Sequence, residues 1–120
     1  MPYRPADAIL PLTPLAFEIL LALHDDDLHG YAILQVVEAR VRGVLPLRTG
    51  TLYRALARLL DDGLIKEVAD ASQPSGDDER RRYYRITPHG RDVARAEARR
   101  LADQVAAARA RKLLSGPHRP

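Results

Sequence analysis

The stretch Thr49–Ile65, TGTLYRALARLLDDGLI, decides the fold of this chain, because it joins an amphipathic helix to the start of a strand. Its apolar residues recur at helical spacing and mark one face that we expect to be buried: Leu52, Leu56 and Leu59. Gly63 follows the last periodic residue, as is typical of a helix that ends in left-handed backbone. The pattern therefore predicts a helix over residues 49–62.

The opposite face of this helix carries hydroxyl and guanidinium groups. A helix that reads base edges in the major groove needs an apolar back, such polar groups in front, and a small residue at its N-terminus. Gly50 supplies that small residue beside free N–H groups that attract anions. From this helix alone, an ordinary amphipathic surface helix explains the pattern equally well. The candidate DNA contacts here are Arg48, Thr49, Gly50, Thr51, Tyr53, Arg54 and Arg58.

Two helices precede this one. Thr13-Pro14 is a typical helix start, and the helix that follows is apolar on several sides until the polar cluster at 24–27. The second helix is expected from about His29-Gly30 to Arg42, before Gly43 and Pro46 break the chain. Residues 1–12 contain three prolines and little periodicity, and we interpret them as an N-terminal arm.

The hydrophobic period changes after Gly63. Residues 64–69 and 81–87 are expected to form two strands of a hairpin around a polar tip. Thr87-Pro88 repeats the helix start, and the last helix is expected over 88–114, followed by a frayed tail at 115–120. The predicted class is mainly α with a small β-hairpin (α+β): a winged helix-turn-helix domain over 13–87 with a long C-terminal dimerisation helix.

Basic residues on the hairpin favour DNA binding over the surface-helix interpretation. A hairpin after a recognition helix grips phosphates or enters the minor groove when it is basic. The acidic run Asp77-Asp78-Glu79 argues against this, because it can pair with the arginines or keep the tip away from DNA. Of Tyr83 and Tyr84, we expect one to pack inward with Ile86. The candidate contacts of this wing are Arg80, Arg81, Arg82 and Tyr83.

The last helix carries a seam of small and apolar residues at alternating four- and three-residue steps: Ala94, Ala98, Leu101, Val105 and Ala108. Such a seam suits packing against another helix. The sequence predicts no second long helix, so we expect a second copy of the chain as the partner. The alternatives are a helix folded back on its own domain, or one that is partly frayed.

The composition and the motifs that are missing argue against several other classes of function. The formal net charge is +3 and Arg dominates the basic residues, which suits nucleic acid but also fits a simple compositional bias. Without cysteine there is neither a disulfide nor a thiolate metal site. The crowded cluster His24–His29 is expected to cap and solubilise rather than bind metal. No catalytic motif, signal peptide or membrane span is evident, so we expect a cytoplasmic protein that is not an enzyme and needs no cofactor.

Four motifs, in this order and spacing, resemble the PadR family of winged-helix regulators across roughly Leu12 to Arg91. They are LTPLAFEILLAL (12–23), HGYAILQVVE (29–38), GTLYRALARLLDDGLI (50–65) and RRRYYRITPHGR (80–91). Arg48-Thr49 and Arg54 depart from residues that are frequent in the family. The single C-terminal helix is similar to that of the family's compact subgroup.

The resemblance implies a homodimeric DNA-binding regulator, usually a repressor at a palindromic operator, often relieved by a small-molecule effector of unidentified chemistry. It also implies DNA contacts from Gly50, Thr51, Tyr53 and the wing arginines. Two alternatives stay open. One is a winged-helix protein-interaction module that no longer binds DNA. The other, within the DNA-binding class, is a MarR-like regulator, although those chains usually run longer.

Overall fold

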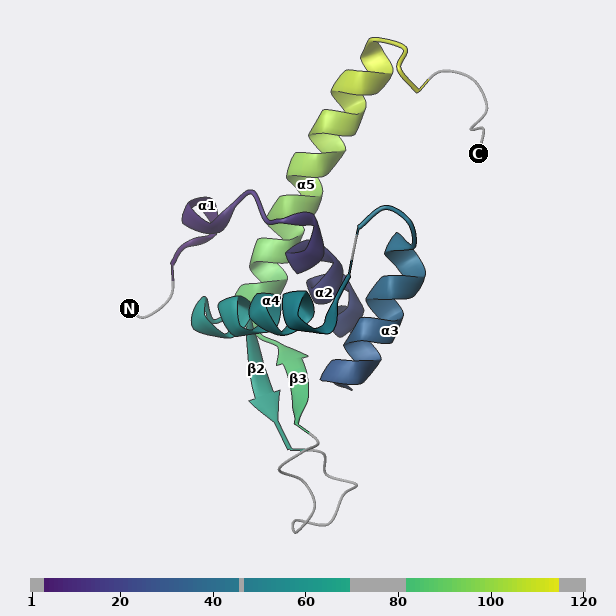
Figure 1. Ribbon diagram of the computed structural model, residues 1–120. Coiled ribbons are helices and arrows are strands. Elements are labelled where there is room, and N and C mark those ends of the chain that lie inside the picture. Colours follow the sequence, from purple (N-terminus) through teal and green to yellow (C-terminus); the bar gives the residue numbers. More distant parts are fainter. Residues whose placement is uncertain (1–3, 46, 70–81, 115–120) are drawn as a thin grey trace.

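The computed structural model describes residues 4–45, 47–69 and 82–114. It has a helical body from which the hairpin and the last helix extend in opposite directions (Figure 1). The elements are α1 (Ala6–Ile9), α2 (Pro14–Asp25), β1 (Leu28–His29), α3 (Gly30–Val41), α4 (Thr49–Asp61), β2 (Ile65–Val68), β3 (Tyr83–Ile86) and α5 (Pro88–Ala110). The predicted α+β winged helix-turn-helix with a long C-terminal helix is confirmed.

The core lies where α2 meets α3, α4, α5 and the strands. Each of the first three long helices buries apolar residues at helical spacing: Ile19, Leu20 and Leu23 on α2, Ile33, Val37 and Val41 on α3, and Leu52, Leu56 and Leu59 on α4. Removing such a side chain from water stabilises the fold by about 1.5–3 kcal/mol. The buried face predicted for α4 is therefore confirmed.

The helix starts predicted from Thr-Pro are confirmed by their hydrogen bonds. The Thr13 hydroxyl accepts a hydrogen bond from the Ala16 N–H at 3.1 Å, and the Thr87 hydroxyl accepts one from the Gly90 N–H at 2.9 Å. Gly63 has φ +74°, the left-handed conformation expected after α4. The last helix ends at Ala110, four residues earlier than predicted.

Two elements were not predicted. The antiparallel sheet has the order β1-β3-β2, so a third strand accompanies the hairpin. β1 is two residues long and α1 four, which is too short for either to show a period. β1 forms because Leu28 and His29 pair with Tyr84 and Tyr83 of β3, a long-range contact that local sequence does not encode.

The end of α4 and the start of α5 meet at a tight junction. The Thr87 N–H donates to the Leu64 carbonyl at 3.0 Å, and the Thr87 hydroxyl donates to the Gly63 carbonyl at 2.6 Å. Gly90 lies directly on this junction, because a Cβ there would overlap the Leu64 carbonyl oxygen and lie 2.8 Å from Ile86. The absence of a side chain at Gly90 therefore lets α5 pack onto the strands.

A buried carboxylate fastens the N-terminal segment to α5. The Glu97 side chain is 2% exposed, and its Oε2 accepts a hydrogen bond from the Leu12 N–H at 3.2 Å. Arg100 donates to both oxygens of Glu97 at 2.6 and 2.9 Å. The hydrogen bonds from Arg100 are the main cause that lowers the pKa of Glu97 below its ordinary value. The segment predicted as an arm thus contributes Leu12 to the core.

We predict that Gly90→Ala lowers the free energy of unfolding by about 3 kcal/mol, because backbone at Leu64 cannot move away as a flexible side chain would. Gly50→Ala is the matched control, since a Cβ there would meet only a guanidinium nitrogen of Arg54, at 3.4 Å. Urea denaturation followed by circular dichroism measures both. Equal stability of the two variants would contradict the tight junction.

We also predict that Glu97→Gln removes part of the pH dependence of stability. Because the folded-state pKa is lowered, the ionised Glu97 stabilises the fold above its unfolded pKa, and this contribution is lost as the pH falls. Urea denaturation should find the variant about 1–2 kcal/mol less stable near pH 7, with a difference that shrinks toward about pH 3. A difference that is constant with pH would rule out this role of the carboxylate.

Candidate nucleic-acid interface

The residues predicted to contact DNA from α4 lie on its solvent side. Thr51 is half-buried, Tyr53 is 45% exposed, and the Arg58 side chain is 73% exposed. The others are exposed: Arg48, Thr49, Gly50 and Arg54. Arg48 is the N-cap of α4 and makes no side-chain cap, so the first N–H groups of the helix are left to solvent or a ligand. The structure thus brings all seven residues together on one accessible element.

The two arginines on α4 are weakly engaged. The Arg54 Nη2 donates to the Thr51 hydroxyl at 3.4 Å, and the Arg58 Nε lies 3.9 Å from the Asp62 carboxylate. Asp62 has a better partner in Arg4, whose guanidinium reaches both carboxylate oxygens at 3.0–3.3 Å. Exposed ion pairs of this kind contribute little stability, so Arg54 and Arg58 are available to a polyanion.

Tyr53 connects the second and third motifs of the sequence. A Cβ on Gly30 would overlap the Tyr53 hydroxyl and lie 2.8 Å from Cζ, so the ring lies against the start of α3. Gly30, in the second motif, therefore leaves the space that the ring of Tyr53, in the third motif, occupies. Sequence analysis named Tyr53 as a DNA contact but missed this packing role, which no local pattern reveals.

The described part of the wing is held by ion pairs. Arg82 donates to Glu67 on the neighbouring strand at 2.7 Å. Arg85 donates from two nitrogens to the Asp27 carboxylate at 2.7–3.1 Å, and this hydrogen bonding lowers the pKa of Asp27. Sequence analysis missed Asp27, which lies 58 residues away in the chain. These pairs orient the strands but also neutralise two wing arginines.

The two tyrosines of β3 point to opposite sides of the sheet. Tyr84 is buried with Ile86, so it is the one that packs inward, and burial raises its pKa. Tyr83 is half-buried and lies edge-on to the His29 ring, with ring centres 5.4 Å apart. Arg80 and Arg81 lie outside the described residues.

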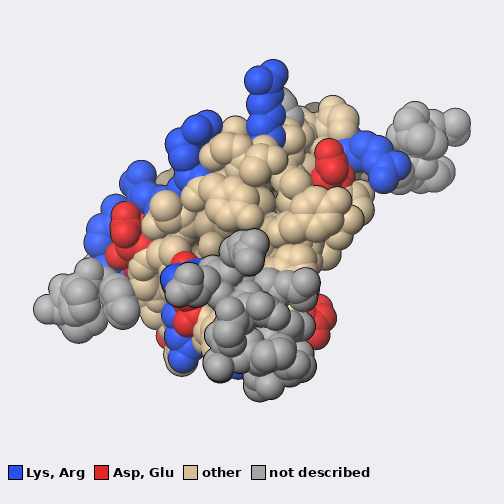
Figure 2. Space-filling view, turned by 60° about the horizontal axis from the view of Figure 1, so that its bottom comes forward, with Lys and Arg blue, Asp and Glu red and all other residues tan. Residues whose placement is uncertain are grey.

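Charge is unevenly spread over this side of the molecule. Figure 2 shows basic side chains along the upper left of this face and at its right end, with acidic side chains beside them at both ends and a surface without charged side chains between. The border of this face is therefore mixed in charge rather than uniformly basic.

The predicted dimerisation seam divides into two parts. Ala94 packs against the chain's own core, in the stretch of α5 that contacts α1, α2 and β3. Ala98 and Val105 are exposed, Val105 by 42%, and Leu101 and Ala108 are half-buried. The C-terminal half of α5 extends away from the body (Figure 1). Three of the five seam residues, Leu101, Val105 and Ala108, are thus on the C-terminal half of α5 that projects.

Over residues 4–45, 47–69 and 82–114, no group of three His, Asp or Glu side chains is arranged to hold a metal ion. None of the helices described there is both long and apolar enough to cross a membrane.

Solved structures with this fold include transcription regulators. A PadR family transcription regulator from Clostridium difficile superposes with a TM-score of 0.65 at 27% identity, covering 81% of this chain and 96% of that one. A transcriptional regulator from Clostridium thermocellum has the same TM-score and identity, with 84% and 90% covered. A protein from Streptococcus mutans shares the fold over 98% of both chains, with a TM-score of 0.65 at 23% identity.

The sequence comparisons agree with the structural ones. Over 84 residues, or 70% of its length, the chain is 39% identical to an uncharacterized 37.1 kDa protein in transposon TN4556 of Streptomyces fradiae. The aligned part is 22% of that protein. The model of the transcriptional regulator PadR-like family matches residues 19–96, which include the helix-turn-helix, the hairpin and the start of α5. This chain therefore belongs to the PadR-like family of transcriptional regulators.

Proposed function

We propose that this chain is a cytoplasmic transcriptional repressor that binds a palindromic operator as a homodimer. The observation that carries this proposal is the exposed face of α4, where Arg54 and Arg58 are accessible and only weakly paired. A small-molecule effector that relieves repression is part of the same proposal. Repression by such a protein follows from occupancy of the operator, which excludes other proteins from that DNA.

In this proposal α4 enters the major groove and the wing follows the phosphates. The apolar back of α4 is buried, so its front is held rigidly, and guanidinium groups can donate two hydrogen bonds to guanine. Arg82 is exposed although paired with Glu67, and a phosphate can replace the carboxylate at little cost. Arg80 and Arg81 are proposed to extend the same phosphate contacts.

The dimer in this proposal forms through the seam of α5, most of which lies on the projecting half. The seam residues Ala98, Leu101, Val105 and Ala108 supply a surface that a second helix can approach closely. A twofold axis through α5 presents two copies of α4, which is why a palindromic operator is expected.

A protein-interaction module without DNA binding is the second candidate. It is favoured by the internal pairing of Arg82 with Glu67 and of Arg85 with Asp27, which removes two described arginines from the free positive charge of the wing. The two candidates differ in whether duplex DNA binds at low salt.

We predict that Arg54→Ala and Arg58→Ala each weaken binding to the chain's own upstream DNA about tenfold, because each removes a base or phosphate contact. Arg82→Ala should weaken binding to all duplexes alike and lower the salt slope by about one. Fluorescence anisotropy on the upstream duplex and a random duplex, across a salt series, measures these effects. Arg95→Ala is the control of equal charge, since Arg95 lies on α5 and pairs with Asp92.

Four results of that experiment have different meanings. Preference for the upstream duplex supports a repressor of its own gene, and equal, salt-dependent binding supports a repressor of a distant operator. Unchanged affinity in all three variants would contradict the docking of α4 and the wing. If no duplex binds even at low salt, the result would favour the protein-interaction module over the DNA-binding repressor.

We predict that Val105→Glu converts the dimer to a monomer, because two glutamates would face each other across the α5 seam. Ala107→Glu adds the same charge to an exposed position on the opposite side of α5 and should leave the dimer intact. Sedimentation velocity measures the mass of each variant. A dimer that survives Val105→Glu would show that α5 does not form the interface.

A further inference from the structure

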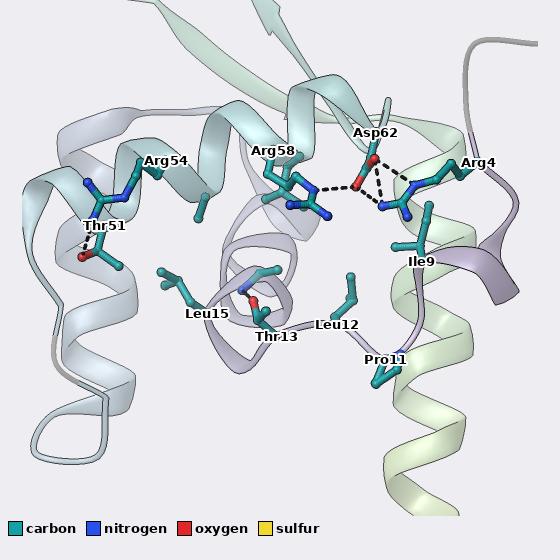
Figure 3. Close-up of a pocket in the computed structure, with 13 residues that line it drawn as sticks. Arg4, Ile9, Pro11, Leu12, Thr13, Leu15, Thr51, Arg54, Arg58 and Asp62 are labelled. Carbon is teal, nitrogen blue, oxygen red and sulfur yellow. Dashed lines mark hydrogen bonds and ion pairs between the residues drawn. The ribbon is translucent and has the colours of Figure 1, made fainter.

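A groove of about 470 Å³ lies between α4 and the segment that links α1 to α2 (Figure 3). Its volume falls within the range of pockets that bind small molecules. One wall is the flank of α4 that carries Thr51, Arg54 and Arg58, the same residues proposed to contact DNA. A ligand in this groove would therefore meet the DNA-contacting side chains directly.

The floor of the groove is aliphatic. The apolar side chains that line it are Ile9, Leu12, Leu15, Ala16, Ala55 and Leu59. None of the lining residues has an aromatic ring, so the groove offers no surface on which a ring can stack. The lining therefore suits an extended hydrocarbon chain better than a flat ring system.

The rim of the groove is positively charged. Three guanidinium groups, from Arg4, Arg54 and Arg58, line the groove together with a single carboxylate, Asp62. Arg4 and Arg58 reach toward Asp62, whereas Arg54 points toward Thr51 (Figure 3). Arg4 satisfies that carboxylate with hydrogen bonds to both oxygens, and its own backbone carbonyl lies 2.8 Å from His89 Nε2. The Arg58 Nε lies 3.9 Å from the Asp62 carboxylate, and the Arg54 Nη2 donates to the Thr51 hydroxyl at the other end of the groove (Figure 3). Arg58 is thus the weakly paired guanidinium that an added anion can reach beside Asp62.

A second hollow on the other side of the body has the opposite charge. It measures about 410 Å³ and combines apolar side chains such as Leu21 and Val36 with two carboxylates, Asp25 and Asp26. Its one guanidinium, Arg40, donates to Glu18 at 2.7 Å. Asp25 and Asp26 would repel an aliphatic carboxylate, so such a ligand should bind the groove beside α4 and not this second hollow.

We propose that the groove beside α4 binds a medium-chain aliphatic carboxylate and that this ligand competes with DNA. The hydrocarbon chain lies on the aliphatic floor, and the carboxylate accepts hydrogen bonds from Arg58. The competition rests on the proposed function, because both ligands need the Arg58 guanidinium. It would make the groove an effector site on the recognition helix itself.

Octanoate is the probe that tests the site on the full-length protein. Methyl NMR should detect shifts at Leu15 and Ala55 in the groove, and none at Val36 in the second hollow. Octylamine and 1-octanol have the same chain without the negative charge, and each should bind at least fivefold more weakly. Equal binding of octanoate and 1-octanol, or no shift at Leu15 and Ala55, would overturn the proposal.

Two variants test the recognition of each end of the ligand. Arg58→Gln should weaken octanoate binding about fivefold, whereas Arg95→Ala, a charge-matched control on α5, should not change it. Ala16→Leu fills the floor from α2 and should abolish octanoate binding while leaving the DNA affinity and the thermal unfolding midpoint unchanged. If Arg58→Gln and Ala16→Leu both bind octanoate as the unmodified protein does, octanoate binds somewhere other than this groove.

Competition is measured separately from binding. Octanoate should raise the apparent Kd for duplex DNA in proportion to its occupancy of the groove, and this effect should disappear in Ala16→Leu. If octanoate binds the groove but leaves DNA affinity unchanged, the proposed competition is wrong. If the protein binds no duplex at all, the proposed function fails, while the octanoate titrations still decide the site.

Discussion

The close approach of Gly90 to the Leu64 carbonyl is the constraint on which the arrangement of this protein depends. Gly63 ends α4 in left-handed backbone, and Thr87 bonds to both Gly63 and Leu64 while its hydroxyl also caps α5. The junction therefore fixes three directions at once: that of α4, that of the strands and that of α5. A side chain at Gly90 would separate these elements, because a backbone carbonyl cannot turn away without breaking the bond from Thr87.

The direction of α5 has consequences at both ends of the chain. Its first turns pack against the body, where Glu97 accepts the Leu12 N–H and holds the N-terminal segment in place. The held segment then forms one wall of the groove beside α4. The rest of α5 extends past the body, where Val105 of the seam is 42% exposed and Leu101 and Ala108 are half-buried. A single buried carboxylate thus links the proposed dimer helix to the wall of the proposed effector site.

The arginines of α4 and those of the wing differ in how strongly they are paired with carboxylates. On α4, Arg54 and Arg58 have weak partners and large exposure, so a ligand gains most of their interaction energy. On the sheet, Arg82 and Arg85 are paired with Glu67 and Asp27, so a phosphate must displace a carboxylate. In the proposed function, α4 makes the specific contacts with DNA and the wing makes salt-sensitive contacts with phosphates.

The helix-turn-helix, the hairpin and the helix starts could all be predicted from the sequence. These features depend on local chemistry: the period of Leu52, Leu56 and Leu59, and the threonine caps at 13 and 87. It also placed the candidate contacts of α4 on the solvent side, since a helical period defines both faces. Contacts between distant residues followed from the folded chain alone. β1 forms through pairing with β3, Tyr53 lies against Gly30, and Asp27 pairs with Arg85. No local pattern encodes these contacts, because each pairs residues whose separation in sequence is unrelated to their separation in space.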